Sequence, residues 1–401
     1  MGEPAPTDIV DVRATVDAVA HRTPILPSRG ISDRLGSPVC LKAENLQRTG
    51  AFKIRGAAAK LASLGTAAKA GLVAASAGNH AQALALAARG LGLRAEVYMP
   101  TNAAIGKVEA CRAYGGIVHD GGESVETAVI AARRRADEAG LEFCHPYDDA
   151  AVIAGQGTIG LEITEQVADL TQLVVPLGGG GLLAGIALAV RDASPSVRIV
   201  GVQAAVCAPY VTGTAPEGPV ATLADGIAVK SPGVLTRPII ERLVDDIVQV
   251  DEAAIADSMM LLAERSKMFV EGGGAVGVAA ILSGAIAPDP RGATCVVLSG
   301  GNVDLGLLPG LIRRQETASG RRLLVFIRIP DRPGALAAIT RLVADGGANV
   351  VEVAHVREGL TLGVRESGLS LTLEVKGPDH ARTILRSLGA AGYDAIESKD
   401  R

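Results

Sequence analysis

A stretch of 21 residues without a single charge, at 170–190, carries four consecutive glycines near its middle. An uncharged segment of this length could cross a bilayer as a helix. Pro176 and the glycine run at 178–181 would break that helix close to its centre. The sequence therefore predicts a buried strand, a glycine loop and a helix starting near Leu182, and it argues against a membrane protein.

Short apolar runs alternate with helical stretches over about the first 310 residues. Residues 72–76 are a predicted strand, for example, and the Ala/Leu-rich segment 79–91 is a predicted helix. Such alternation predicts βαβ units and a mostly parallel sheet, whose ligands bind at the carboxyl ends of the strands. Three glycine-rich turns follow predicted strands and should share that edge, namely 76–80, 178–181 and 299–302.

The pattern changes after a polar, charged segment at 311–322. Beyond it, the sequence predicts the order β-α-β-β-α-β, which is typical of a ferredoxin-like domain. The expected elements are strands at 323–329, 349–355, 369–376 and 393–396, and helices at 333–344 and 379–391. We therefore expect a first domain at 1–315 with a smaller subdomain at about 50–150, a hinge at 316–322, and a second domain at 323–401.

Composition excludes several classes of partner. Lysine and arginine number 39 against 43 aspartates and glutamates, so the formal net charge is 39 − 43 = −4, and no global charge favours nucleic acid or anionic membranes. Aromatic residues make up 2% and tryptophan is absent, which argues against base-stacking surfaces. The five cysteines are scattered, and the N-terminus lacks the apolar core of a signal peptide. These features predict a cytoplasmic protein with reduced thiols and no metal site.

Lys53 lies between Phe52 and Ile54 at the start of a predicted helix. A lysine in this position could simply extend its amine to solvent along an apolar surface. Alternatively, apolar neighbours would lower the pKa of the amine and make it a nucleophile.

The glycine-rich turns also allow two interpretations each. The turn at 76–80 could only cap a helix, or its free N–H groups could hold a carboxylate. The run at 178–181 could be a linker, but it joins two apolar elements, and a strand, glycine loop and helix in succession can hold a phosphate. It lacks the GK[ST] and GxGxxG patterns, so ATP and NAD are not expected. The turn at 299–302 could be structural only.

Four segments in this order resemble one family. They are LKAENLQRTGAFKIRGA at 41–57, SAGNHAQ at 76–82, GGGGL at 178–182 and LSGGN at 298–302. Over about residues 8–315 the chain resembles the threonine/serine dehydratases among the fold-type II pyridoxal-phosphate enzymes. The segment at 331–334 is similar to that of an ACT regulatory domain, as in the single-ACT form of threonine ammonia-lyases. The resemblance implies an α/β fold with two parallel-sheet subdomains, pyridoxal 5'-phosphate between them, and a C-terminal βαββαβ ACT domain.

The resemblance also implies a role for each matched residue. Lys53 is expected to form the Schiff base, with Phe52 packing beside the cofactor ring. Asn79 is expected at the cofactor's 3′-oxygen and Ser299 at its pyridine nitrogen. The phosphate is expected to be bound by the backbone of Gly178, Gly179, Gly180, Gly181 and Leu182. The substrate carboxylate is expected to be held by Ser76, Gly78, Asn79 and His80.

The implied reaction is β-elimination from L-threonine to 2-oxobutanoate and ammonia, with L-serine as a secondary substrate. A hydroxyl rather than a carboxylate at the pyridine nitrogen favours elimination over transamination. The resemblance further implies a homotetramer and an amino-acid effector bound near Gly334 and Asn349, although both residues could be purely structural. Asp225 resembles a residue near the cation site of some relatives, but one carboxylate does not predict a metal.

Two departures from the family pattern bear on the function. Ala51 stands where many relatives have serine, which affects how the substrate is positioned. Ala77 stands where related serine racemases have a serine that acts as an acid and base, so racemisation should be minor. The alternatives on the same fold are a 3-hydroxyaspartate dehydratase and a serine racemase. The alternative of another class is a catalytically silent amino-acid sensor.

Overall fold

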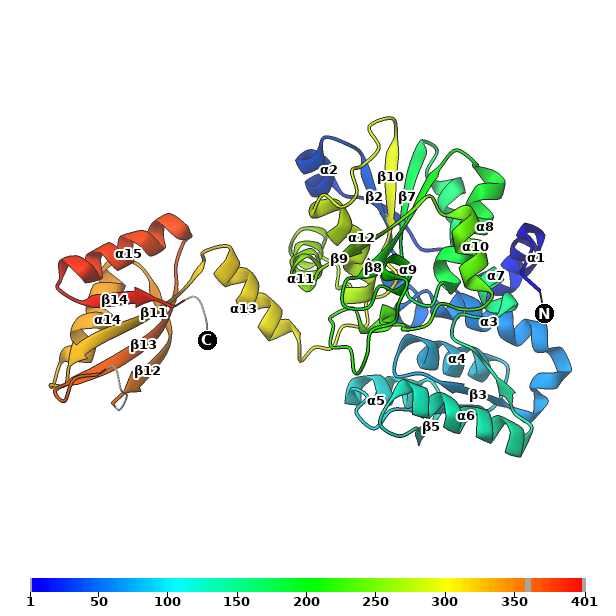
Figure 1. Cartoon of the computed structure of the whole chain (residues 1–401), viewed down its shortest axis with the longest axis horizontal. Helices are drawn as coiled ribbons and strands as arrows, with labels where there is room; N and C mark the ends of the chain where they lie inside the picture. The colour runs from blue at the N-terminus through cyan, green and yellow to red at the C-terminus, as the bar shows by residue number, and fades with distance from the viewer. Residues whose placement is uncertain (1, 358–361, 399–401) are drawn as a thin grey trace. The chain divides into compact units, whose positions relative to one another are not determined.

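The computed structural model describes residues 2–357 and 362–398 and divides the chain into two compact units, Met1–Asp304 and Leu305–Arg401 (Figure 1). Each unit has its own sheets and its own hydrophobic core. The first unit holds all three glycine-rich turns at strand ends, but the expectation that they share one sheet edge is wrong. The turn at 76–80 follows a strand of a four-stranded sheet, whereas the turns at 178–181 and 299–302 follow strands of a six-stranded sheet.

A six-stranded sheet forms the centre of the first unit, in the order β1-β2-β10-β7-β8-β9. All neighbouring strands are parallel except β1 and β2, as the βαβ alternation predicts. The strands are β1 (Ile25–Pro27), β2 (Val39–Lys42), β7 (Leu170–Pro176), β8 (Arg198–Ala204), β9 (Asp246–Val250) and β10 (Ala293–Val297). Helices α8 (Gly181–Ala193) and α12 (Gly272–Leu282) lie on opposite faces of this sheet (Figure 1).

A smaller sheet in the same unit has the order β5-β4-β3-β6, with all strands parallel. Its strands are β3 (Leu72–Ala75), β4 (Ala95–Met99), β5 (Ile117–Asp120) and β6 (Glu142–Phe143). The helices that precede or connect these strands are α3 (Lys53–Leu64), α4 (Asn79–Gly90), α5 (Ile105–Ala113) and α6 (Val125–Ala139). The remaining α-helices of the unit are α1 (Pro6–Asp17), α2 (Arg29–Leu35), α7 (Ala150–Gln166), α9 (Pro209–Thr212), α10 (Thr236–Leu243) and α11 (Glu252–Leu261).

The uncharged stretch at 170–190 forms β7, the glycine loop and the first turns of α8. Strand β7 is buried over its last five residues, and α8 is buried along its first ten. Within residues 2–357 and 362–398, no helix has the length and apolarity needed to span a membrane.

The second unit contains the predicted β-α-β-β-α-β order, which the structure confirms. Its elements are β11 (Arg322–Pro330), α14 (Ala335–Asp345), β12 (Asn349–Val356), β13 (Glu366–Glu374), α15 (Pro378–Ala390) and β14 (Asp394–Glu397). The sheet is antiparallel throughout, in the order β12-β13-β11-β14. Alternate residues of β11 pack against the two helices, which gives the unit a separate core.

The segment that precedes β11 differs from the expected hinge at 316–322. Helix α13 (Leu308–Ala318) occupies most of the polar segment, and only residues 319–321 lie between α13 and β11. Leu308, Leu311 and Ile312 recur at helical spacing, and Leu311 is buried. The charged residues therefore belong to an amphipathic helix, because the apolar spacing outweighs the polar composition.

Candidate active site

The end of β10 brings two of the predicted motifs together. The backbone of Ala51 forms an antiparallel bridge with Gly300, and the Phe52 N–H donates a hydrogen bond to the Ser299 carbonyl over 3.1 Å. The Gly301 N–H donates to the Gly50 carbonyl over 2.8 Å. Residues 50–52 and 299–301, far apart in the sequence, thus form one short ladder immediately before α3.

Lys53 is the first residue of α3, and its amine forms no ion pair with a carboxylate of the residues that the structure describes. Its Nζ donates to the Pro146 carbonyl oxygen over 2.8 Å and lies 5.1 Å from the centre of the Phe52 ring. Burial lowers the pKa of the amine to about 8, against a smaller opposing effect of Glu271. A substantial fraction of this amine is therefore neutral near physiological pH and can act as a nucleophile or a base.

The glycine loop presents a row of unused hydrogen-bond donors. Among the described residues, the backbone N–H groups of residues 178–183 have no hydrogen-bond acceptor, although residues 179–183 are buried. Gly180 adopts φ +99° as the N-cap of α8 and so turns the chain into the helix. Buried donors without acceptors are rare, and donors at the start of a helix attract anions. This arrangement fits a bound phosphate.

Tyr147 explains why side chains are excluded from this loop. A Cβ on Gly179 would lie 2.5 Å from atoms of the Tyr147 ring, and one on Gly181 would lie 2.8 Å from the Tyr147 carbonyl. Thr236 secures the other side, since its hydroxyl donates to the Gly179 carbonyl over 2.7 Å. The loop is therefore held by its neighbours, which supports the phosphate interpretation over the linker.

Asn79 begins α4 and belongs to a chain of side-chain amides. Its Nδ2 donates to Glu271 Oε1 over 2.7 Å, and its Oδ1 accepts from Asn302 Nδ2 over 2.8 Å. Asn302 also donates to the Thr49 carbonyl over 2.7 Å, where Thr49 adopts φ +63°. Burial, followed by Asp225, raises the pKa of Glu271 to about 7. Asn79 is thus held in a fixed orientation at the carboxyl edge of β3.

The turn at 76–80 forms a second site with open donors. The Gly78 N–H donates to Ser76 Oγ over 3.2 Å, whereas the N–H groups of Asn79 and His80 have no acceptor among the described residues. The His80 ring points away to the Cys144 carbonyl, 3.0 Å from Nε2, and burial lowers its pKa to about 3. His80 is therefore neutral and offers its backbone, not its ring, to a ligand.

The loop at 144–149 contributes to the site, although its sequence predicts no functional role. The Cys144 carbonyl holds His80, the Pro146 carbonyl holds Lys53, and the Tyr147 ring packs against the glycine loop. Asp148 and Asp149 accept hydrogen bonds from the first turns of α10 and α7, respectively. These contacts are mostly made by carbonyls and caps, which leave no motif in the sequence.

The remaining predicted residues lie as follows. Ser299 follows β10 and is almost fully buried. Asp225 pairs with Lys107 of α5 over 2.6 Å. In the second unit, Gly334 caps α14 with φ +88°, and Asn349 begins β12 with its amide 3.3 Å from Glu374. Both conformations are also what a purely structural role requires.

Comparison with known proteins gives a consistent result. Residues 16–300 match the family described as "Pyridoxal-phosphate dependent enzyme". The L-threonine ammonia-lyase of Geobacter sulfurreducens is 43% identical over 380 residues, which cover 93% of this chain and 94% of that protein.

Two solved structures are similar to the chain as well. Maize serine racemase has a TM-score of 0.73 and 35% identity, covering 79% of this chain and 98% of that one. The tomato (Solanum lycopersicum) threonine deaminase isoform 2, in its processed form, has a TM-score of 0.72 and 32% identity, covering 78% of this chain and 90% of that one.

Proposed function

Because this chain belongs to the family of pyridoxal-phosphate-dependent enzymes, we propose that it converts L-threonine to 2-oxobutanoate and ammonia, as an L-threonine ammonia-lyase does. Water leaves in the β-elimination and is taken up again when the released product is hydrolysed, so ammonia is the only group lost overall. The products are 2-oxobutanoate and ammonia, so the chain is a carbon–nitrogen lyase. The observation that carries the proposal is the Lys53 amine, which forms no ion pair among the described residues, in the same site as the open N–H groups of the glycine loop.

The residues present fit pyridoxal phosphate. The unused N–H groups at 178–182 would hold its phosphate, and Lys53 would hold its aldehyde carbon. Asn79 would bind the ring oxygen, Ser299 the ring nitrogen, and Phe52 would pack beside the ring. When bound, this cofactor supplies an electron sink for the bond that breaks at the α-carbon.

The protein's own groups then select the reaction. The open N–H groups of the turn at 76–80 bind the substrate carboxylate at the start of α4. Lys53, with its lowered pKa, takes the proton from the α-carbon. Ser299 offers a neutral hydroxyl to the ring nitrogen, which leaves elimination as the favoured outcome.

A serine racemase is the second candidate, because the maize enzyme is among the similar structures. Ala77 weighs against it, since a methyl group cannot return a proton to the opposite face of the α-carbon. A 3-hydroxyaspartate dehydratase remains an alternative on the same fold. L-Serine is the proposed secondary substrate, because one methyl group changes binding by only about 1–3 kcal/mol.

Regulation and assembly complete the proposal. We assign the segment 1–315 to catalysis and 323–401 to an ACT domain that binds an amino-acid effector near Gly334 and Asn349. The proposed assembly is a homotetramer in the cytoplasm, acting in isoleucine biosynthesis or threonine catabolism. The βαββαβ order and the separate core of the second unit support an independent regulatory domain.

The direct test is formation of 2-oxo acid from L-threonine, L-serine and threo-3-hydroxyaspartate. Wild type and Lys53→Ala are compared with added pyridoxal phosphate, with and without isoleucine. We expect 2-oxobutanoate to form from threonine with the wild type and not with Lys53→Ala. A change in the rate of its formation when isoleucine is added would support the effector site. No 2-oxo acid from any of the three would overturn the proposal and favour the sensor.

A further inference from the structure

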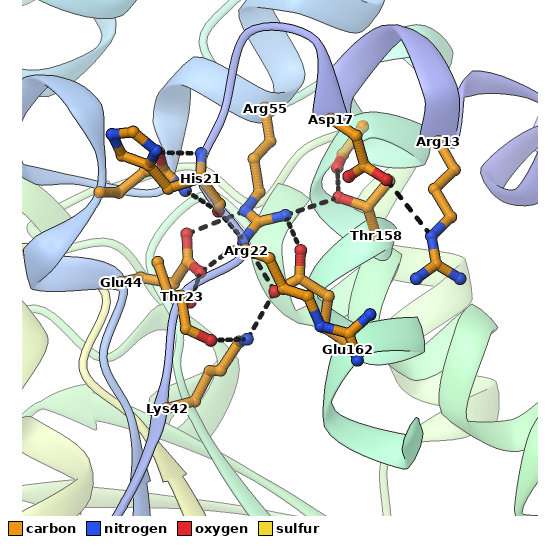
Figure 2. Close-up of polar contacts among 12 residues, drawn as sticks. Arg13, Asp17, His21, Arg22, Thr23, Lys42, Glu44, Arg55, Thr158 and Glu162 are labelled. Carbon is orange, nitrogen blue, oxygen red and sulfur yellow. Dashed lines mark hydrogen bonds and ion pairs between the residues drawn. The ribbon is translucent and has the colours of Figure 1, made fainter. Parts of the chain in front are cut away.

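Arg55 and Lys53 leave the first turn of α3 on opposite sides. Residues two positions apart are about 200° apart around a helix axis, so the two side chains diverge. The Arg55 side chain is completely buried, with 0% exposure, and it points into a cluster of polar side chains (Figure 2).

Every N–H of the Arg55 guanidinium has an acceptor. Nε and Nη2 donate to the two carboxylate oxygens of Glu44, over 2.9 and 2.8 Å. Nη1 donates to Glu162 Oε1 over 2.6 Å and to Thr158 Oγ1 over 3.2 Å. Nη2 also donates to the His21 carbonyl over 3.0 Å. The planar guanidinium fork is thus held by two carboxylates at once, and the single amine of a lysine could not reproduce this arrangement.

Lys42 completes the cluster. Its Nζ donates to Glu162 Oε2 over 2.5 Å and to the Thr23 carbonyl over 2.8 Å (Figure 2). It also donates to Gln166 Oε1 over 2.8 Å. The Thr23 hydroxyl donates to Glu44 Oε1 over 2.5 Å. We call Lys42, Glu44, Arg55 and Glu162 the buried tetrad. It contains two positive and two negative groups, each with no more than 2% of its side chain exposed.

The tetrad joins the segments that flank Lys53. Glu44 belongs to the short helix Glu44–Leu46, which leads to the ladder with residues 299–301. Glu162 belongs to α7, and the loop before α7 supplies the carbonyl that accepts from the Lys53 amine. Between these points α3 crosses α7 closely, since a Cβ on Gly155 would lie 2.6 Å from the Arg55 carbonyl oxygen.

Stability alone is a weak reason for such a cluster. Desolvation of buried ion pairs roughly cancels their attraction, and apolar residues of the same volume often stabilise a protein as well or better. Burial acts to lower the pKa of Arg55, but Glu44 and Glu162 outweigh it and raise that pKa above its ordinary value. A permanently charged, fully hydrogen-bonded fork instead specifies one geometry for the turn that carries it.

We propose that Arg55 is a positioning residue: through the buried tetrad it fixes the rotation of the first turn of α3, and thereby holds the Lys53 amine beside Pro146. The inference rests on the proposed function of Lys53. Every N–H of Arg55 is used within the cluster, so its effect is on the reactive geometry and not on binding of the amino acid.

The test compares variants on the two sides of the α3–α7 crossing in the full-length protein with pyridoxal phosphate bound. Arg55→Lys keeps the charge but loses the fork. The double variant Lys42→Met with Glu162→Gln removes one positive and one negative group, so it preserves the charge balance if Arg55→Lys fails to fold. Lys60→Met is the matched control, because Lys60 also lies on α3 and forms a largely buried pair, over 2.6 Å, with Asp149, the N-cap of α7.

Three readouts separate positioning from stability: the melting temperature, kcat and KM for L-threonine, and the visible circular dichroism of the bound cofactor. All variants should have a lower melting temperature than the wild type. The tetrad variants should lose about 10- to 100-fold in kcat, with little change in KM, and should alter the visible dichroism. Lys60→Met should leave kcat and the dichroism close to wild type.

Two outcomes would contradict the inference. One is a folded tetrad variant whose kcat and visible dichroism match those of Lys60→Met at similar loss of stability. The other is a rise in KM alone. A wild-type protein without 2-oxobutanoate formation would refute the proposed function instead, and the visible dichroism would still test the positioning.

Discussion

Lys53 and Arg55 share one turn of α3, yet their charged groups meet very different surroundings. The Arg55 guanidinium faces two carboxylates and has an acceptor for each N–H. The Lys53 amine donates to a single backbone carbonyl, and burial lowers its pKa to about 8. The difference shows where this fold satisfies its polar groups and where it leaves them available for a ligand.

The glycine loop belongs with Lys53 in this comparison. Its buried N–H groups have no acceptor among the described residues, in contrast to the tetrad, whose donors are all used. Unsatisfied buried donors and an uncompensated buried amine both reduce stability. Their concentration in one site is therefore better explained by a bound anion and a reaction than by folding.

The largest expected effect comes from replacing Lys53 with methionine. The same replacement of Lys60, also on α3, serves as the control. Lys53→Met should reduce 2-oxobutanoate formation by about 10²- to 10⁴-fold or more, because it removes the proposed base. Without cofactor it should also stabilise the protein at neutral pH by roughly 1–3 kcal/mol, since the pKa of Lys53 is lowered from 10.5 to about 8 and its charged form is disfavoured. Steady-state kinetics and thermal unfolding would measure both effects.

Lys60→Met is the control for that prediction, because Lys60 has the carboxylate partner that Lys53 lacks. It should lower the melting temperature and preserve activity. If the two substitutions changed stability in the same direction, the contrast between a compensated and an uncompensated amine would be wrong.

The next prediction concerns the open donors of the glycine loop. In Gly179→Ala the new methyl group would lie 2.5 Å from the Tyr147 ring, so the loop must move and the N–H groups lose their common direction. Affinity for pyridoxal phosphate should fall by about tenfold or more, with a loss of stability of about 1–3 kcal/mol. Titration with the cofactor, followed by visible absorbance, measures the affinity. Gly106→Ala, where nothing lies within 4 Å of the added Cβ, should match wild type.

Glu271 gives a pH-dependent test of the contrast between buried groups that are paired with an opposite charge and buried groups that are not. Its pKa is raised from 4.5 to about 7, so between these values the folded protein binds more protons than the unfolded chain. The contribution of Glu271 to stability is therefore present below pH 4.5 and is lost as the pH rises through 7. Glu271→Gln lacks this loss, so its stability relative to wild type should increase across that range, on the order of 1–3 kcal/mol. Thermal unfolding of both proteins on either side of the range would show it; a constant difference would count against the raised pKa.

The smallest effect is expected at an exposed ion pair. Asp225 accepts from Lys107 over 2.6 Å, and the Asp225 side chain is 59% exposed. Asp225→Asn should change the free energy of unfolding by at most about 1 kcal/mol, and less at high salt. Denaturation at low and high ionic strength measures this. A loss as large as that of a tetrad variant would show that exposure does not separate the two kinds of ion pair.

Much of the fold was predictable from the sequence because its signals are local. The strand predicted at 72–76 and the helix predicted at 79–91 match β3 and α4 to within one residue, and the glycine run at 178–181 connects β7 to α8 as expected. The polar segment at 311–322 differs from the predicted hinge for a physical reason. Its composition indicates a hinge, whereas the spacing of Leu308, Leu311 and Ile312 forms α13.

The candidate site was predictable only where a residue acts through a recognisable motif. Lys53, Asn79 and the glycine loop stand in such motifs, and the structure brings them together through contacts between two sheets. Asn79 follows β3 of the small sheet and bonds to Asn302 beyond β10, and the segment 146–147 contacts both Lys53 and the glycine loop. Glu271 and the carbonyl of Pro146 act through contacts between distant segments, so neither shows in the sequence. The buried tetrad is a similar case, because Lys42 and Glu162 are 120 positions apart and only the fold joins them.

The most direct test of this account is to locate the lysine that carries the cofactor. The protein is loaded with pyridoxal phosphate, reduced with borohydride to make the link permanent, and digested for peptide mass mapping. We predict that the pyridoxyl label lies on Lys53 and that Lys42 and Lys60, each paired with a carboxylate, stay unlabelled. A label on either of those lysines, or none on Lys53, would contradict the claim that the uncompensated amine of α3 is the reactive group.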